Sequence, residues 1–472
     1  MNILIPQEAM PIMADIEAEG GTPVLVGGIV RDQVIAQVRG LEVAPSKDVD
    51  IEVHGLSLDR LIPVLQRHGL VHLVGASFGV IKVTLSDGQQ IDVSLPRRES
   101  KDGRGHKGFM VEPDPFMTIE EAASRRDFTI NSMLARRDGT VEDPFDGFRD
   151  IVGGMLRATS ERFADDPLRV LRGMQFAARF NLVMDVNTAM LSRSLLPEFG
   201  TLSAERIFGE FSKLARAPHP SAGLEVLVKT GWIAAFPILA ALRDVPQDAE
   251  WHPEGDVFEH TRQTADRAAE IARREGLDAQ KTEILVFAGM FHDVGKATTT
   301  EHRPDGRIIS HGHADAGADM TADFLASLRA PEHVLRPVVQ LVREHMVHTG
   351  AQPTPAVVRR LARRLAPGGR PELHTTVRML TLLSEADASG RAPAPAANPM
   401  AEWAAVAEQL NIAEQRPEPI LKGRHLIAAG FTPGPIFRTL LQTAFELQLE
   451  GEITDEASAI AWMNHAAALT LV

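Results

Sequence analysis

The first 150 residues alternate short apolar runs with amphipathic stretches. Four runs rich in β-branched residues predict strands: "TPVLVGG", "DVDIEVHG", "GVIKVTL" and "QQIDVSL". Between them, "LSLDRLIPVLQRHG" has the three- and four-residue apolar spacing of a helix. This mixture predicts a small α/β or α+β domain at the start of the chain.

From about residue 160 the strand pattern gives way to long segments with helical spacing, so we expect helices throughout the remainder. Two breaks interrupt this pattern, near residues 243–256 and 387–400. The second break, "DASGRAPAPAANPM", is a Pro/Ala linker that cannot pack as a regular element. The pattern therefore predicts a multidomain α+β chain, with a mixed-sheet head followed by all-α domains.

Length and composition limit the class of protein. A chain of 472 residues with 44% hydrophobic residues is long enough for three or four domains. It has no cysteine, which suits a reducing interior, and no tyrosine, for which we have no physical account. The start lacks a signal peptide's basic flank, and no apolar run approaches membrane-spanning length. We therefore expect a cytoplasmic protein that does not engage a membrane.

The formal net charge of −14 argues against wholesale coating by nucleic acid, but it leaves room for a local basic track. The segment 357–370, "VVRRLARRLAPGGR", is a candidate. Four of its five arginines, at 359, 360, 363 and 364, have helical spacing, with no acid nearby in the sequence. Contact with RNA phosphates is one interpretation, and a solvated helix face is the commoner one.

Two acids and two glycines near the start predict a metal-dependent nucleotide site. Asp48 and Asp50 would point to one face of a strand, where two carboxylates repel each other unless a cation such as Mg²⁺ joins them. Gly27 and Gly28 would let a bulky anion approach the backbone, beside the fixed charge of Arg31. Either element alone is more often a plain turn or an exposed strand, but their combination favours a triphosphate site.

A third element, "DDPLRVLRGMQFAARF" (residues 165–180), has helical spacing and places Asp166 beside Arg169. Together they offer a hydrogen-bond acceptor, the carboxylate, next to a hydrogen-bond donor, the guanidinium. That pair fits the pairing edges of cytosine and adenine and rejects those of uracil and guanine. The alternative is an ordinary surface ion pair between residues three apart.

These motifs occur in a familiar order. "GGIVRD" with "DVD", then "RRDFTIN", "DPFDGFRDI", "DDPLRVLR" and "AERIFGE", resemble the signature motifs of the bacterial class II tRNA nucleotidyltransferases, the CCA-adding enzymes, and of the related poly(A) polymerases. The segment "PILKGRHLIAAGFTPGPI" resembles the body and tail of that family. The resemblance implies a polymerase β-like head. It also implies catalytic Mg²⁺ ligands at Asp48 and Asp50, and nucleotide-binding residues at Gly28, Arg31, Arg126, Asp166, Arg169 and Arg172.

Two features bear on how many nucleotides such an enzyme adds. The chain has Gln175 where the family usually has an arginine, and Arg179, one turn further, is positioned to compensate. The loop 97–109 corresponds to the family's flexible loop, whose presence favours the full C, C, A programme over addition of C alone.

Histidines are concentrated in the middle of the chain. Nine of the 17 lie between His252 and His348, and "FAGMFHDVGK" places His292 beside Asp293 at the end of an apolar helix. This pattern resembles the HD phosphohydrolase domain, which implies hydrolysis of a phosphoester such as a 2′,3′-cyclic phosphate. The ligand set implied by the resemblance, for Mg²⁺ or a divalent transition metal, is His260, His292, Asp293 and Asp387, with His313 and His345 as the extra pair of two-metal versions.

The resemblance implies an enzyme that adds C, C and A to tRNA 3′ ends from CTP and ATP, with an HD phosphohydrolase activity used in tRNA repair. The alternatives are a poly(A) polymerase, a specialised A-adding or CC-adding enzyme, and an HD phosphohydrolase with an RNA-binding head. The sequence leaves the oligomeric state open. The expected domains are a nucleotidyltransferase head at 1–150, a helical neck at 151–245, an HD domain at 246–390 and a helical tail at 401–472.

Overall fold

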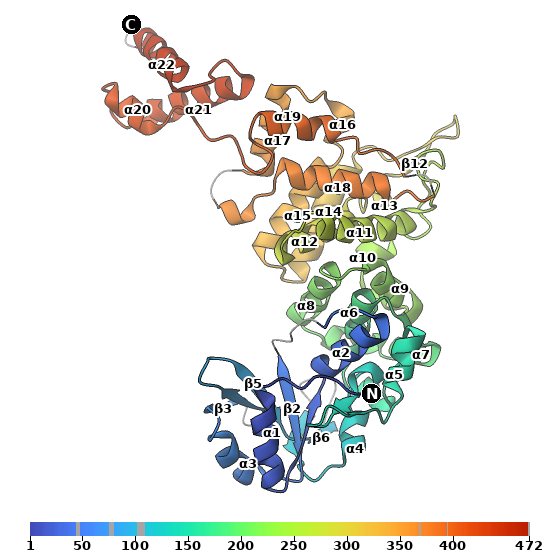
Figure 1. Cartoon of the computed structure of the whole chain (residues 1–472). Helices are drawn as coiled ribbons and strands as arrows, with labels where there is room; N and C mark the ends of the chain where they lie inside the picture. The colour runs from blue at the N-terminus through green and yellow to red at the C-terminus, as the bar shows by residue number, and fades with distance from the viewer. Residues whose placement is uncertain (44–47, 75–79, 102–108, 368–369, 394, 471–472) are drawn as a thin grey trace. The chain divides into compact units, whose positions relative to one another are not determined.

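The chain folds into two compact units, residues 1–235 and 236–472 (Figure 1). The computed structural model describes residues 1–43, 48–74, 80–101, 109–367, 370–393 and 395–470. The first unit contains a mixed sheet and a set of helices, and the second is built mainly from helices. Over the described ranges, no helix is long and apolar enough to cross a membrane.

A seven-stranded mixed sheet forms the centre of the first unit. Its order is β3-β4-β5-β2-β1-β8-β9, in which β2 and β5 pair in parallel and the other neighbours are antiparallel. The four predicted strands correspond to β1, β2, β4 and β5, so the expected mixed-sheet head is confirmed. The strands are β1 (Thr22–Val26), β2 (Val49–His54), β3 (Leu70–Val74), β4 (Val80–Thr84), β5 (Gln90–Ser94), β8 (Leu134–Ala135) and β9 (Val141–Glu142).

Strand β2 separates a buried face from an acidic face. Val49, Ile51 and Val53 are buried, whereas Asp50 and Glu52, which alternate with them, are partly exposed. Successive side chains of a strand point to opposite faces, so apolar packing on one side fixes both acids on the other.

Helix α2 (Gly28–Arg39) begins directly after β1, at the glycine pair. Gly27 has a φ of 75°, a left-handed backbone conformation that suits glycine. Ile29, Val30 and Val34 then bury one face of the helix. The remaining helices around the sheet are α1 (Ala9–Ala18), α3 (Leu58–Leu65), α4 (Ile119–Ser124) and α5 (Gly147–Gly153).

The described residues of the segment predicted as a flexible loop, 97–109, belong to two paired strands. Strand β6 (Arg97–Lys101) pairs antiparallel with β7 (Phe109–Pro113). Residues 102–108, the rest of the predicted loop, lie outside the described residues.

Helix α6 (Leu168–Phe180) is the centre of the helical part of the first unit, where it packs against two other helices. Its partners are α8 (Ala204–Ala215) and α9 (Pro220–Thr230), and α7 (Val186–Ser194) packs on α9. The chain also forms short strands that the expectation of helices alone missed. These two-residue strands are too short to leave a period-two pattern: β10 (Met155–Leu156), β11 (Val183–Met184), β12 (Glu301–His302) and β13 (Ile308–Ile309).

The second unit packs around α12 (Ala279–Phe291), whose residues from Glu283 to Phe291 are all buried. Helices α11 (Val257–Arg274), α15 (Glu332–Glu344) and α18 (Val377–Ser389) pack directly against it. The other helices of this part are α10 (Pro237–Ala240), α13 (Lys296–Thr299), α14 (His313–Ser327), α16 (Val347–Gly350) and α17 (Pro355–Leu365).

Both predicted breaks separate helices. Between α10 and α11, residues 243–256 form no regular element. The second break is shorter than predicted, because α18 runs to Ser389. From 390 to 400 the described residues contain neither helix nor strand. Helix α19 (Ala401–Gln409) follows and packs against α17 and α18. The helices after it share a small apolar core: α20 (Gly423–Ala428), α21 (Pro435–Glu450) and α22 (Glu456–Thr470).

The basic stripe on α17 is largely neutralised by acids from elsewhere in the second unit. Arg360 pairs with Glu450, and Arg363 Nη1 lies 2.5 Å from Glu446 Oε1. Arg364 makes a two-pronged pair with Glu344, at 2.7 and 2.8 Å. The fourth arginine, Arg359, donates to the backbone oxygen of Leu449 at 3.4 Å. No acid lies near the stripe in the sequence, and its acidic partners come from distant segments of the chain.

A buried polar network joins the sheet of the first unit to α6. Asp127 accepts hydrogen bonds from Arg172 Nε at 2.7 Å and from Asn131 Nδ2 at 2.8 Å. Asn131 Oδ1 in turn accepts one from Arg31 Nη1, at 2.7 Å. The Arg31 guanidinium lies 5.0 Å from the ring centroid of Phe176, on α6. Hydrogen bonds and a cation–π contact therefore hold the two parts in one arrangement.

We expect Asp127→Asn to destabilise the first unit by about 2 kcal/mol near neutral pH, because a buried charged hydrogen-bond acceptor is lost. Burial alone raises the pKa of Asp127, but Arg172 and Asn131 outweigh it and the pKa is lowered. This stabilisation is present above the unfolded pKa of about 4 and is lost as the pH falls through the lower folded pKa. Hydrogen exchange of the α6 amides should show a large difference from wild type near neutral pH and a smaller one in acid.

The matched control is Asp59→Asn, which changes an exposed aspartate on α3. It should leave α6 exchange unchanged. Equal protection of α6 in wild type and Asp127→Asn would contradict the structural role of the network.

Candidate functional site

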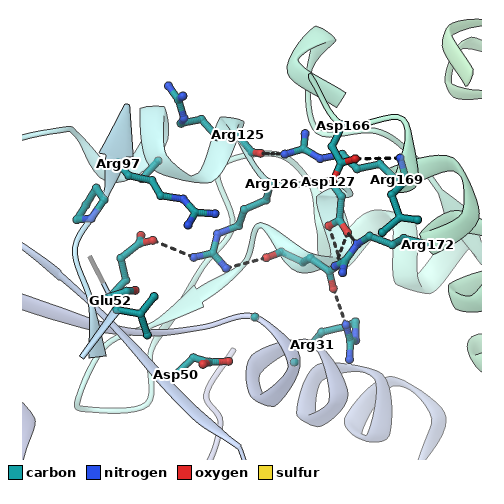
Figure 2. Close-up of a pocket in the computed structure, with 18 of the residues that line it drawn as sticks. Arg31, Asp50, Glu52, Arg97, Arg125, Arg126, Asp127, Asp166, Arg169 and Arg172 are labelled. Atoms are coloured by element: carbon teal, nitrogen blue, oxygen red, sulfur yellow. Dashed lines mark hydrogen bonds and ion pairs between the residues drawn. The ribbon is translucent and has the colours of Figure 1, made fainter. Parts of the chain in front are cut away.

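A cavity of about 560 Å³ lies between the acidic face of the sheet and the start of α6 (Figure 2). It brings together most of the residues that the sequence nominates for the head, although they are far apart in the chain. The nominated residues that line it are Gly28, Arg31, Asp50, Arg126, Asp166, Arg169 and Arg172.

The two nominated acids, Asp48 and Asp50, differ in burial and in secondary structure. Asp50 is in β2 and is partly buried, whereas Asp48 is exposed and precedes the strand, which begins at Val49. Asp48 lines a second, neighbouring cavity of about 1370 Å³, which Asp50 lines as well. The acid pair therefore lies where the two cavities meet.

A third carboxylate, which the sequence analysis missed, lies beside Asp50. Asp92 is the direct partner of Asp50 in the parallel pairing of β2 with β5. The pKa of Asp50 is raised, first by burial and then by the negative charges of Asp92 and Asp48. Asp92 lies in "QQIDVSL", a predicted strand. An acid between two apolar residues of a strand is a pattern from which this site residue could have been predicted. Three neighbouring carboxylates form a place where a cation is favourable.

Arg126 is fixed in the cavity by an acid from β2. Its Nη2 atom lies 3.2 Å from Glu52 Oε2, and its Nη1 donates to the backbone oxygen of Asn131 at 3.4 Å. Figure 2 shows the Arg126 side chain extending toward Glu52. Glu52 also lies 3.2 Å from His54. Burial alone raises the pKa of Glu52, but Arg126 outweighs it and the pKa is lowered, so Glu52 keeps its charge and holds the arginine.

Arg31 is a buried and oriented cation. It is 5% exposed and is held by Asp32 and by Asn131, both at 2.7 Å. Burial lowers its pKa, although Asp32 opposes that effect. A Cβ atom at Gly28 would lie 3.5 Å from Arg31 Nη2, an ordinary contact, so the protein itself leaves room for a small side chain there. The backbone itself requires glycine at Gly27, where φ is 75°.

Asp166 and Arg169 both line the cavity, but each is held by other groups. Asp166 precedes α6 and its Oδ2 accepts a hydrogen bond from Arg206 Nη2 at 2.8 Å. Arg169 donates to the backbone oxygens of Arg162 and Arg125, both at 2.7 Å. No ion pair between residues 166 and 169 is therefore needed to position them. Arg206 belongs to the motif "AERIFGE" but was not among the predicted site residues, because a helical arginine carries no local signal of its distant partner.

Gln175 and Arg179 line the second cavity and are not part of the first. Gln175 is buried. Arg179 Nη2 lies 2.7 Å from Asp32 Oδ2, and its guanidinium is 4.8 Å from the ring centroid of Phe180. Arg179 therefore does not replace a missing cation in the first cavity.

A second site lies in the second unit, where all six nominated ligands come together. They are buried, with no residue more than 9% exposed. Helices α11, α12, α14, α15 and α18 and their ends carry them: His260, His292, Asp293, His313, His345 and Asp387.

These ligands form two groups that share Asp293. On one side, His292 Nε2 lies 3.3 Å from Asp293 Oδ2 and 3.3 Å from His260 Nε2. On the other side, Asp293 Oδ1 lies 3.3 Å from His313 Nε2 and 3.8 Å from His345 Nε2. The two oxygens of one carboxylate therefore face two separate sets of donors.

Asp387 completes the first group, with Oδ1 3.2 Å from His260 Nε2 and 3.9 Å from His292 Nε2. Burial alone raises the pKa of Asp387, but His260 and His292 outweigh it and hold the pKa well below its usual range. Arg391 Nη2, 3.0 Å away, also favours the charged carboxylate. Asp387 therefore stays ionised at the centre of the cluster.

The histidine rings are oriented as metal ligands are. The Nδ1 atoms of His292, His313 and His345 donate to the backbone oxygens of Gly289, Ser310 and Val342, at 2.9, 2.7 and 2.6 Å. In the neutral form of each ring the one proton is therefore on Nδ1, and the Nε2 lone pair faces the cluster. Converging lone pairs repel one another unless a cation lies between them, so this donor set fits divalent metal ions.

Burial lowers the pKa of His345 to about 3, with help from His292 and His313. Its ring is therefore neutral, which is the form that binds a metal.

Two further groups support the ligands and were missed from the sequence. Glu254 Oε1 lies 2.7 Å from His260 Nδ1 and 2.9 Å from His252 Nδ1. Burial alone raises the pKa of Glu254, but these two histidines lower it to about 2. Lys296 Nζ lies 2.7 Å from Asp293 Oδ2. The lysine was within reach of sequence reasoning, since it stands three residues after Asp293 in "HDVGK".

Three family models match the chain. Residues 24–157 match the poly A polymerase head domain, and residues 257–378 match the HD domain. Residues 181–242 match a probable RNA and SrmB-binding site of polymerase A.

Solved CCA-adding enzymes share the fold. The enzyme from Bacillus stearothermophilus in complex with CTP has a TM-score of 0.62 and 20% identity, over 99% of both chains. The enzyme from Thermotoga maritima complexed with tRNA has a TM-score of 0.59 and 16% identity, over 98% of this chain and 96% of that one.

Curated relatives are more similar in sequence. The multifunctional CCA protein of Nitrosococcus oceani is 33% identical over 427 residues, which is 89% of this chain and 95% of the relative. That of Neisseria meningitidis serogroup B is 34% identical over 399 residues, or 83% of this chain and 88% of the relative. The matches extend through both units, and we conclude that the chain belongs to the family of the multifunctional CCA proteins.

Proposed function

We propose that this protein adds C, C and A to the 3′ ends of tRNA, using CTP and ATP. The observation that carries the proposal is the first cavity, which combines an acid cluster with several arginines and with Asp166 and Arg169. Relatives that share the chain almost end to end are named multifunctional CCA proteins. The working site of the protein would be the cytoplasm, where tRNA is the polymer substrate and a membrane has no part.

In this reaction the tRNA 3′-hydroxyl attacks the α-phosphorus of the nucleotide, and pyrophosphate leaves. Asp48 and Asp50 would hold Mg²⁺, with Asp92 beside them. When bound, the metal supplies positive charge for the attacking and leaving oxygens. Arg126, held by Glu52, and Arg31, held by Asn131, would bind the triphosphate with little reorganisation, because both are already fixed.

The second cavity is a route for the acceptor strand. It opens on the same acid pair and is lined by basic side chains that suit phosphates. Because Gln175 lies there and not in the first cavity, its departure from the family arginine bears on the acceptor strand more than on the triphosphate. These basic residues are Arg39, Arg172, Arg179, Lys213 and Arg216.

Asp166 and Arg169 would select the base. A carboxylate accepts from the amino group of cytosine or adenine, and a guanidinium donates to the adjacent ring nitrogen. Arg206 would keep Asp166 in place, and Arg172 would support the pair. Uracil and guanine would leave polar groups unpaired, which is costly in a confined site.

The second site would hydrolyse phosphoesters such as 2′,3′-cyclic phosphates at damaged tRNA ends. Its six buried ligands would hold Mg²⁺ or a divalent transition metal, which when bound provides Lewis acidity and activates water. Water adds to phosphorus, the bond to the 3′ oxygen breaks, and that oxygen takes the proton, while the phosphate stays on the 2′ oxygen. The resulting free ribose oxygen is what the first site would extend.

This assignment gives the chain four working parts. We propose a nucleotidyltransferase head at 1–150, a helical neck at 151–245, an HD domain at 246–390 and a tail at 401–472. The principal rival, a poly(A) polymerase, shares the head, and a CC-adding or A-adding enzyme shares the whole chain. An HD phosphohydrolase with an RNA-binding head is the remaining alternative. Product analysis distinguishes all of them.

The two activities should be separable by single substitutions. Asp50→Asn should reduce extension of a tRNA lacking its CCA end by about a thousandfold or more, because a metal-holding carboxylate is lost, and should spare phosphoester hydrolysis. Asp293→Ala should have the reverse effect. The measurement is product sizing with labelled CTP and ATP, alone and together, alongside hydrolysis of a 2′,3′-cyclic phosphate.

Two C residues followed by one A support the proposal, and a long A ladder would favour the poly(A) polymerase. Addition of C alone or A alone would indicate a specialised enzyme, and no extension by the wild type would leave the phosphohydrolase. Asp59→Asn is the control for both assays.

Asp166→Ala should relax nucleotide choice by about tenfold to a hundredfold in kcat/KM, because the acceptor that rejects uracil and guanine is lost. Arg206→Ala should have a weaker effect of the same kind, since it frees Asp166 without removing it. Incorporation of UTP and GTP relative to CTP and ATP measures the change. Asp165→Ala, at the neighbouring position outside the cavity lining, is the matched control, and an equal loss with all four nucleotides would argue against base selection by Asp166.

A further inference from the structure

A third cavity, of about 380 Å³, adjoins the metal-ligand cluster of the second unit. Its lining includes the ligand His313, and Lys296, which contacts the ligand Asp293. Strand β13 and the loop before α11 supply other walls, and Trp251 belongs to that loop. The volume lies at the lower end of the range for small-molecule pockets, about 300–1,000 Å³.

The loop that carries Trp251 is tied to the cluster at two points. His252 binds Glu254, which contacts the ligand His260 at 2.7 Å. Gln247 Oε1 accepts a hydrogen bond from Lys296 Nζ at 2.8 Å. Residues on both sides of Trp251 are therefore fixed by groups that touch metal ligands, so its position relative to the cluster is set.

Trp251 itself is unusual because it is exposed. It is 63% exposed, whereas Trp232 and Trp403 are almost fully buried. An anchored loop that presents a large aromatic ring beside a cavity has the features of a stacking platform for planar ligands. The cavity is also lined by a cation, Lys296, and by the metal ligand His313. It therefore combines the aromatic surface of Trp251 with a site suited to phosphoesters.

We propose that Trp251 stacks on the nucleobase of the RNA 3′-terminal nucleotide whose phosphoester enters the second site. The inference rests on the proposed phosphohydrolase function and deepens it. It assigns this site a nucleotide substrate with a base subsite, rather than any small phosphoester. Stacking on an aromatic ring tolerates every base, so the subsite accepts different 3′ ends and is not selective among them.

The test compares two substrates that differ only in the base. Uridine 2′,3′-cyclic phosphate carries one, and the 2,3-cyclic phosphate of methyl riboside does not. Uridine is chosen because the nucleotide site of the first unit is proposed to reject it. Trp251→Ala should raise KM for the uridine substrate by about tenfold to a hundredfold, with kcat changed little, and should leave the base-free substrate unaffected.

Trp251→Phe keeps an aromatic ring and should restore most of the lost affinity. Binding is read independently by tryptophan fluorescence in the presence of a chelator, which prevents hydrolysis. Uridine 2′,3′-cyclic phosphate should quench the wild type. The quenching should be absent in Trp251→Phe and present in the control Trp462→Phe.

The outcomes separate the two proposals. If the wild type hydrolyses neither substrate, the phosphohydrolase function fails. If it hydrolyses both and Trp251→Ala affects them equally or not at all, the base subsite is wrong and the phosphohydrolase function stands. Unchanged hydrolysis of the base-free substrate verifies that the second unit of Trp251→Ala is folded, and extension of tRNA lacking its CCA end should be unchanged as well.

Discussion

One buried carboxylate, that of Asp127, holds the first unit in its working arrangement. It accepts hydrogen bonds from Arg172 on α6 and from Asn131 in the segment after α4. Asn131 in turn accepts a hydrogen bond from Arg31 at the start of α2. A charged acceptor in this position is stable only when all its donors are present, so the network favours a single geometry. The cavity depends on that geometry, because Arg31 and Arg172 line it and the acids of β2 lie opposite.

The second unit is governed by a different constraint, the crowding of lone pairs. Backbone carbonyls fix three histidine rings by their Nδ1 atoms, and the Nε2 atoms converge on Asp293 and Asp387. Such a centre is unfavourable by itself and favourable around cations. Glu254 and Lys296 extend the same network to the loop of Trp251. The proposed base subsite thus follows from contacts that also support the ligands.

Charge is arranged locally in both units, which reconciles an acidic chain with a polyanionic substrate. Around the first cavity, arginines outnumber acids, and Arg169 is fixed by neutral backbone oxygens. On α17 the arginines are instead paired with glutamates, among them Glu344 and Glu446. A run of basic residues is therefore available to phosphates only where the fold leaves its charge uncompensated.

The sequence by itself determined the mixed-sheet head and the mainly helical remainder and nominated residues for both sites, because these depend on local periodicity and ordered motifs. The nominated ligands of the second unit do meet, and so do most of those of the first. Tertiary structure alone decided the rest. Asp92 reaches Asp50 through strand pairing, Arg206 reaches Asp166 across a helix packing, and the acids that neutralise α17 arrive from distant helices. Such partners are fixed by long-range packing, which leaves no spacing rule in the chain.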